Sequence, residues 1–119
     1  MLSSDQFFHV APRGARGAID KHGIDYRRGS PQWEETEEDS LRANYMTPDI
    51  DEARGYRKMA EAMSRSDEQE NWQGTDERYD IWQVHMPDKH ARQLAPDPLT
   101  DSGVMRRAPV PRSWTRRIE

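Results

Sequence analysis

The sequence predicts an α+β fold, because strand-like and helix-like segments follow one another without the regular alternation of a doubly wound sheet. Its 119 residues suffice for one domain with a single modest core. Only 33% of the residues are hydrophobic and 34% are charged, which leans towards disorder. Four tryptophans, four tyrosines and two phenylalanines counter that tendency, since each buried aromatic side chain removes a large apolar area from water. We therefore expect one domain over 1–119, with polar loops at 25–43 and 64–78.

The chain is expected to open with a strand followed by a short helix. The run QFFHVA, 6–11, is apolar, aromatic and β-branched, and Pro12 ends it. An apolar face that includes Ile19 then predicts a helix. Gly23 follows its last turn, where a positive φ is common. Ile24 is expected to fold back onto Ile19.

A second strand and a longer helix are expected after the first polar loop. ANYMT, 43–47, is strand-like, Thr47 suits the cap of a helix and Pro48 suits its first position. Acidic residues in the next turn favour the positive end of the helix dipole. Apolar residues recur every three or four positions and define the buried face: Ile50, Ala53, Tyr56, Ala60 and Met63.

The strongest strand pattern is YDIWQVHM, 79–86. Trp82, Val84 and Met86 alternate with Tyr79, Ile81, Gln83 and His85, so apolar side chains point to both faces and the strand is expected to be central. The segment 87–103 is predicted to be loop with one helical turn, and 104–110 a last strand. Trp114 and Ile118 are expected to anchor the tail.

The composition excludes several classes of site and location. Without cysteine, no disulfide or cysteine-ligated zinc can form. The net charge of −4 disfavours a nonspecific nucleic-acid grip, which needs a basic face. No apolar run has the length of a signal peptide or a membrane span, so we expect a cytoplasmic protein. Of the 18 basic residues only Lys21, Lys58 and Lys89 are lysines, a bias of GC-rich genomes that suggests an actinobacterial or phage source.

Charged segments and two short motifs are the remaining candidates for a site. The acidic block EETEED, 34–39, and an arginine-rich tail are read as solvated segments, although such arginines could hold a phosphate. GARG, 14–17, has only two glycines and is read as a flexible helix entry. His85 and His90 lack a recognised ligand spacing, so no metal site is expected.

Five segments, in chain order, resemble the ADP-ribosyltransferase fold: FFHVAP, IDKHGID, NYMTPDIDEARGY, YDIWQV and APVPRSW. The likeness is to the diphtheria-toxin and poly(ADP-ribose) polymerase branch, whose signature is His, Tyr, Glu. It covers most of the chain apart from the two polar loops. It implies a split sandwich of two antiparallel sheets with short helices. The implied activity is cleavage of NAD and transfer of ADP-ribose to a macromolecular target, for which a protein is expected.

The resemblance assigns roles to four residues. His9 matches the histidine that holds the nicotinamide ribose, and Val10 matches the next residue, whose backbone pairs with the carboxamide. Tyr45 and Tyr56 are eleven positions apart, as are the family's two tyrosines that flank the nicotinamide ring. Two aromatic faces can sandwich a flat, electron-poor ring. NAD is thus the expected ligand, with His9 and Tyr45 also expected in catalysis.

Departures from the family pattern leave the third catalytic role open. Val10 and Ala11 replace the usual glycine and small hydroxyl residue after the histidine. No glutamate occupies the late strand, where the family's carboxylate stabilises the positive charge that develops on the sugar. Arg106 is expected in its place, with Arg107, Asp101 and Gln83 as alternatives, and Glu119 lies after the strand.

Three functions therefore remain open. The first is an active ADP-ribosyltransferase or NAD-cleaving enzyme. The second is a degenerate member that binds a nucleotide without turning it over. The third is a non-catalytic protein-interaction module, such as a phage factor acting on a host protein, with the acidic block 34–39 as its contact surface. Fold alone does not choose among them.

Overall fold

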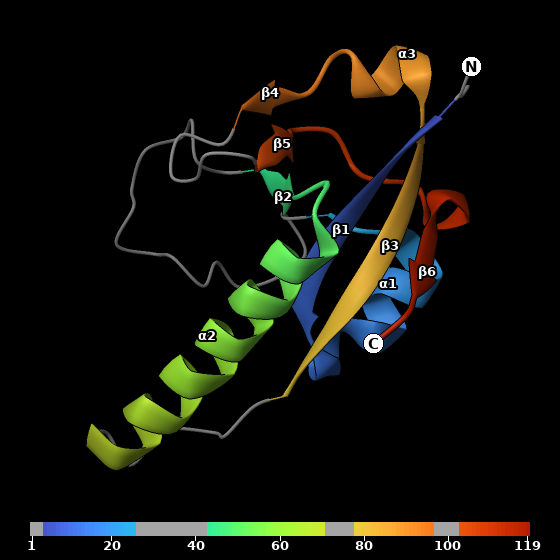
Figure 1. The fold of residues 1–119 in the computed structure, drawn as a ribbon. Coiled ribbons are helices and arrows are strands. Elements are labelled where there is room, and N and C mark those ends of the chain that lie inside the picture. Colours follow the sequence, from blue (N-terminus) through green and yellow to red (C-terminus); the bar gives the residue numbers. More distant parts are fainter. Residues whose placement is uncertain (1–3, 26–42, 71–77, 97–102) are drawn as a thin grey trace.

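The computed structural model describes residues 4–25, 43–70, 78–96 and 103–119 (Figure 1). The first sheet has the order β1–β3–β6, with β1 at Ser4–Pro12, β3 at Tyr79–Pro87 and β6 at Thr115–Arg117. The second sheet has the order β2–β5–β4, with β2 at Asn44–Met46, β5 at Val104–Arg106 and β4 at Ala95–Pro96. All strand pairs are antiparallel, which confirms the predicted α+β class with two antiparallel sheets.

Five helical segments complete the described fold: η1 (Arg13–Ala15), α1 (Arg16–His22), α2 (Ile50–Glu70), α3 (Asp88–Ala91) and η4 (Arg112–Trp114). The single turn α3 lies in the segment 87–103, as predicted, but β4 lies in the same segment, where loop was predicted. The predicted last strand, 104–110, is a strand only over β5. Within the described ranges, no helix combines the length and the apolarity needed to cross a membrane. The acidic block 34–39 and Asp101 lie outside the described residues, and the single-domain organisation stays a prediction.

β3 is the central strand of the first sheet, as its two apolar faces predicted. It pairs with all nine residues of β1, from Ser4 opposite Pro87 to Pro12 opposite Tyr79. Its other edge pairs with β6, where Trp82 lies opposite Arg117. β6 was not predicted, because the charged sequence TRR carries no apolar alternation.

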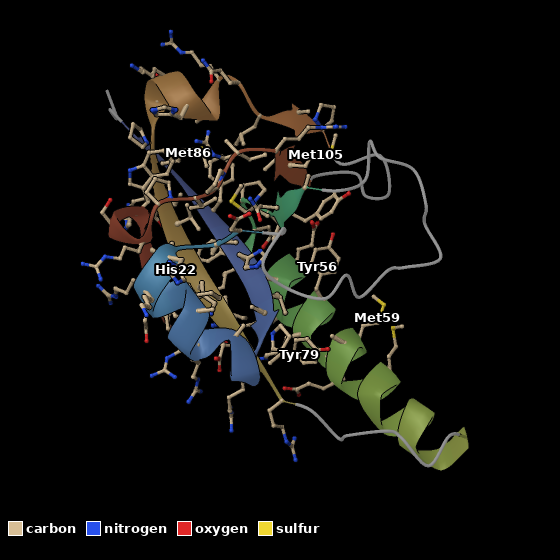
Figure 2. All side chains as sticks on the ribbon, turned by 180° about the vertical axis from the view of Figure 1, so that it is seen from behind. His22, Tyr56, Met59, Tyr79, Met86 and Met105 are labelled. Carbon is tan, nitrogen blue, oxygen red and sulfur yellow. The ribbon has the colours of Figure 1, made fainter. Side chains whose placement is uncertain are left out.

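The two faces of the first sheet carry separate cores, and we name them the α1 face and the α2 face after the helix that covers each (Figures 1 and 2). The α1-face core comprises Phe7, Ala11, Ile19, Ile24, Met46, Trp82, Val84, Met86 and Val110. The α2-face core comprises Phe8, Ala53 and Ile81, with Val10, Ile50 and Ile118 packed against them. Burying one large apolar side chain stabilises a fold by about 1.5–3 kcal/mol, so both faces contribute.

Helix α1 ends as the sequence predicts. Gly23 has a φ of 81°, and its N–H donates to the Ile19 carbonyl at 2.8 Å. Ile24 then exchanges two backbone hydrogen bonds with Val110, at 2.9 and 2.8 Å. Ile19 and Ile24 share the α1-face core, as expected. This turn therefore joins α1 to the C-terminal segment.

Helix α2 differs from its prediction at both ends. Thr47 Oγ1 accepts the Asp49 N–H at 3.2 Å, but the helix begins at Ile50, where the Asp49 carboxylate accepts the Asp51 N–H at 2.9 Å. The helix continues to Glu70, so the part of the predicted loop at 64–70 is helical. That run is polar but holds no glycine or proline, and a polar segment without a breaker can continue a solvated helix.

The predicted buried face of α2 holds only near its start. Ala53 is fully buried and Tyr56 is half-buried, whereas Met63 is 41% exposed. Figure 1 shows the reason, since the second half of α2 extends beyond the end of the sheet. The helix period thus places Met63 on the same side of α2 as Ala53, but the core does not extend as far as Met63.

Candidate functional site

The imidazole of His9 is held where β1 and β2 separate. His9 Nδ1 lies 2.7 Å from the Tyr45 carbonyl oxygen. A carbonyl can only accept, so Nδ1 carries the proton and Nε2 of the neutral ring carries the lone pair. Within the described part of the chain, no donor is hydrogen-bonded to Nε2. The neutral ring therefore keeps an acceptor lone pair that no described group uses.

Strand pairing leaves an unpaired backbone edge next to His9. Phe8 exchanges hydrogen bonds with Thr47 at 2.7 and 2.9 Å, so the N–H and C=O of Phe8 point towards β2. Along a strand these directions alternate, so those of Val10 point to the same side. Among the described residues the backbone pairing does not continue to Val10, since the Phe8–Thr47 bridge is isolated. The Tyr45 carbonyl oxygen is instead hydrogen-bonded to the His9 ring. No described strand pairs with this side of Val10.

The opposite side of the ladder supports this orientation. Val10 lies opposite Ile81, whose N–H and C=O are bonded to Glu119 and Ile118 across the far edge of β3, at 2.9 and 3.0 Å. The Val10–Ile81 pair is therefore a non-hydrogen-bonded pair of the antiparallel ladder. Among the described residues, the N–H and C=O of Val10 consequently have no strand partner at the edge of β1, directly after His9.

Two buried polar atoms were missed by the sequence reasoning. Trp82 Nε1 and Asn44 Oδ1 are occluded without a hydrogen-bond partner in the described residues. Trp82 lies opposite His9 on the neighbouring strand, and Asn44 precedes Tyr45. Asn44 is 2% exposed, and its Nδ2 donates to the Ala108 carbonyl at 2.9 Å. The only signal in the sequence was an amide at the start of the apolar run NYM.

Tyr56, one of the two predicted ring-stacking tyrosines, lies on the other face of the first sheet from the imidazole. Phe7 and Ala11 face α1, so alternation puts the His9 ring on the α1 face, while α2, which carries Tyr56, covers the other face. The Tyr56 hydroxyl donates to Glu52 Oε1 at 2.8 Å (Figure 2). Tyr45 contacts His9 through its backbone carbonyl. The geometry therefore counts against a single slot lined by the side chains of His9, Tyr45 and Tyr56.

Arg106 is occupied by contacts within the fold. Its Nε donates to the Pro109 carbonyl at 3.2 Å, and its guanidinium lies 5.3 Å from the centre of the Trp114 ring. Burial lowers the pKa of the Arg106 guanidinium. Arg106 pairs with Asn44, so it lies on the opposite face of the second sheet from Tyr45. These contacts suit a packing role.

The other candidates for the third role are also placed elsewhere or lie outside the described residues. Gln83 Nε2 donates to Gln6 at 3.1 Å on the α2 face. The carboxylate of Glu119, which the sequence places after the last predicted strand, is bound by Arg54 and Arg57 of α2. In the described ranges, no carboxylate contacts His9.

The charge state of His9 yields a testable prediction. Burial lowers the pKa of the His9 imidazole, and the hydrogen bond to Tyr45 only partly opposes this. The unfolded chain takes up the proton first as pH falls, so this contribution to stability is complete above about pH 6.5 and is lost below it. We expect His9→Gln to lose less stability than the unsubstituted protein between about pH 7 and 5, measured by urea unfolding. His85→Gln, at an exposed position of β3, is the control. If His9→Gln left the dependence of unfolding free energy on pH unchanged, the buried neutral ring would be contradicted.

Neither a metal cluster nor a known relative identifies this site. The described residues include no group of three His, Asp or Glu side chains that could hold a metal ion. Comparisons with protein-family models, with curated proteins and with solved structures gave no match. The functional interpretation therefore rests on the geometry around His9.

Proposed function

We propose that the protein is an ADP-ribosyltransferase-like protein that binds NAD at the open edge of β1. The observation that carries the proposal is the backbone of Val10, which has no strand partner on this side among the described residues, beside the unused Nε2 lone pair of His9. A carboxamide has one acceptor oxygen and an NH₂ donor, so it complements one free N–H and one free C=O. Backbone pairing between a strand edge and a ligand does not depend on the side chain. Valine at position 10 is therefore compatible with this contact.

His9 would contribute the second contact of the same ligand. Its Nδ1 is fixed by the Tyr45 carbonyl, so the ring is oriented before a ligand arrives. Its Nε2 can accept a hydrogen bond from a ribose hydroxyl. A preoriented ring binds with a smaller loss of conformational entropy than a free one. The site thus supports recognition of a nicotinamide riboside unit.

Transfer of ADP-ribose to a protein target is the enzymatic form of this proposal. Departure of nicotinamide leaves positive charge on the ribose, and a carboxylate that stabilises this charge contributes several kcal/mol. Among the described residues, Glu119 is bound by two arginines and Arg106 is packed on Trp114. These contacts favour a second candidate, in which the chain binds the nucleotide without turning it over.

Thermal unfolding with ligands tests the binding step. A ligand at 100 times its Kd stabilises the folded state by about 2.7 kcal/mol, so we expect NAD to raise the Tm. His9→Ala is expected to fold and to lose the NAD-induced shift. Val10→Pro removes an N–H that is not used in pairing with β3, and edge strands tolerate proline at such positions. This variant should also show a smaller NAD-induced increase in Tm. His85→Ala is the matched control on β3 and should keep it.

Two outcomes separate the candidates. Release of nicotinamide from NAD, together with transfer of labelled ADP-ribose to protein in a lysate, identifies the enzyme. A Tm shift without nicotinamide release identifies the nucleotide-binding form. If millimolar NAD, ADP-ribose and nicotinamide all leave the Tm unchanged, both forms are contradicted.

A further inference from the structure

Most described arginines outside α1 and its neighbours are used by the fold. Arg54 and Arg57 hold the Glu119 carboxylate, and Arg92 pairs with Asp88 at 2.6 Å. Arg106 lies over the Trp114 ring. Among the described residues, arginines that have no carboxylate partner of their own lie around α1.

One buried carboxylate faces three guanidinium groups beneath α1. Asp80 is 1% exposed, and Arg16 binds both of its oxygens, at 2.7 and 2.8 Å. Arg13 approaches the same carboxylate at 3.8 Å, and Arg117 adds a further favourable charge interaction. The hydrogen bonds from Arg16 are the largest cause that lowers the pKa of Asp80. The Asp80 charge thus faces three positive charges, and Asp20 of α1 adds a second acidic charge near Arg16.

Two more arginines extend this positive region. The Arg13 N–H donates to the Arg78 carbonyl at 2.8 Å, so Arg78 flanks Arg13. Arg112 Nη1 donates to the Asp20 carbonyl at 3.3 Å, which brings its charge to the far end of α1. We define the basic face as Arg13, Arg16, Arg78, Arg112 and Arg117. Figure 2 looks onto α1 and shows His22 on the same helix.

Gly17 leaves the backbone of α1 exposed beside Arg16 of the basic face. It is exposed within α1, and a Cβ there would have no atom within 4 Å. The fold therefore gains nothing from glycine at this position, although glycine costs about 1 kcal/mol relative to alanine inside a helix. A bare backbone between arginines allows a partner to approach the helix closely.

We propose that the basic face is a docking surface for a carboxylate-rich segment of a partner protein. Arg16 already shows on Asp80 the two-pronged binding of a carboxylate that the other guanidinium groups can repeat. The net charge of −4 disfavours a long phosphate polymer, which would extend past the basic face and meet the acidic remainder of the chain. A short acidic segment fits within the positive region. This inference does not depend on NAD binding.

Fluorescence anisotropy with labelled decaglutamate tests the surface. We expect binding at about 20 mM salt that weakens strongly at about 200 mM, because exposed charges are screened. Arg117→Gln should weaken binding by about fivefold or more. Arg116→Gln is the matched control. Arg116 neighbours Arg117 on β6 but points to the other face of the sheet, so the substitution removes the same charge from outside the basic face. Equal effects of the two variants would contradict a localised surface.

Gly17→Ala separates docking from folding. Alanine is the better helix former and meets no neighbour, so the Tm should rise. The added methyl group stands where the partner approaches, so decaglutamate binding should weaken. A Tm increase with unchanged binding would show that the partner does not approach α1 at Gly17 and would overturn the placement.

An oligothymidylate of the same length decides the chemistry of the partner. The proposal requires that decaglutamate bind at least as tightly as the oligonucleotide. Tighter oligonucleotide binding with the same dependence on Arg117 would assign the basic face to nucleic acid instead. If neither probe binds at low salt, the face is not a docking surface for anions.

Discussion

Replacing Gly23 with alanine is expected to destabilise the fold by about 2–4 kcal/mol, whereas a Cβ at Gly17 or Gly55 would meet no neighbour. Its φ of 81° lies in the region that an alanine adopts only with strain. An added Cβ would overlap the Val110 carbonyl oxygen and would lie 2.8 Å from the Arg112 nitrogen. Both neighbours are backbone atoms, so neither can rotate away. Chemical denaturation measures the loss of unfolding free energy. In thermal unfolding, the Tm should fall by roughly 10 °C or more.

Gly55→Ala is the control for this prediction. Gly55 lies exposed in α2, and a Cβ there would have no atom within 4 Å. Alanine should therefore stabilise the protein by up to about 1 kcal/mol through helix propensity. Opposite signs at the two positions are required. A Gly23→Ala protein that melts within about 2 °C of the unsubstituted one would show that the turn is not fixed against Val110.

The sequence predicted those elements whose signal is local. The central strand at 79–86 carries apolar side chains on both faces, and Gly23 ends a helix with an apolar face, so both were found from spacing alone. β6 was missed because its residues, Thr115–Arg117, are held by pairing with β3 rather than by an apolar pattern. The extension of α2 to Glu70 was missed because polarity was read as loop, although polarity alone does not end a helix.

The candidate site was predictable only in part. His9 could be singled out because an imidazole stands within an apolar strand, and the structure adds its partner, the Tyr45 carbonyl. The open backbone edge at Val10 depends on strand register, which no side chain in this segment encodes. The occluded amide of Asn44 likewise depends on how the two sheets meet. Such features arise between segments distant in sequence, so a single sequence does not specify them.

Substitution of Arg16 with glutamine is expected to destabilise the protein far more than substitution of Arg13, because it leaves the Asp80 carboxylate buried without its bidentate partner. The pKa of Asp80 is lowered in the folded state, chiefly by the hydrogen bonds from Arg16. This contribution is therefore complete above the ordinary carboxyl value of 3.8 and is lost as pH falls below it. Urea unfolding at pH 7 measures the loss.

Arg13→Gln is the control, because Arg13 also approaches Asp80 but only at 3.8 Å and with 55% of its side chain exposed. Its removal should cost less than about 0.5 kcal/mol. Adding Asp80→Asn to Arg16→Gln should recover at least about 1 kcal/mol, since a neutral amide costs less to bury than an unpaired carboxylate. Recovery by the second substitution identifies the buried charge as the cause, because lost packing of Arg16 alone would make the double variant no more stable than the single one. Equal losses for Arg13→Gln and Arg16→Gln would contradict the assignment of the bidentate pair.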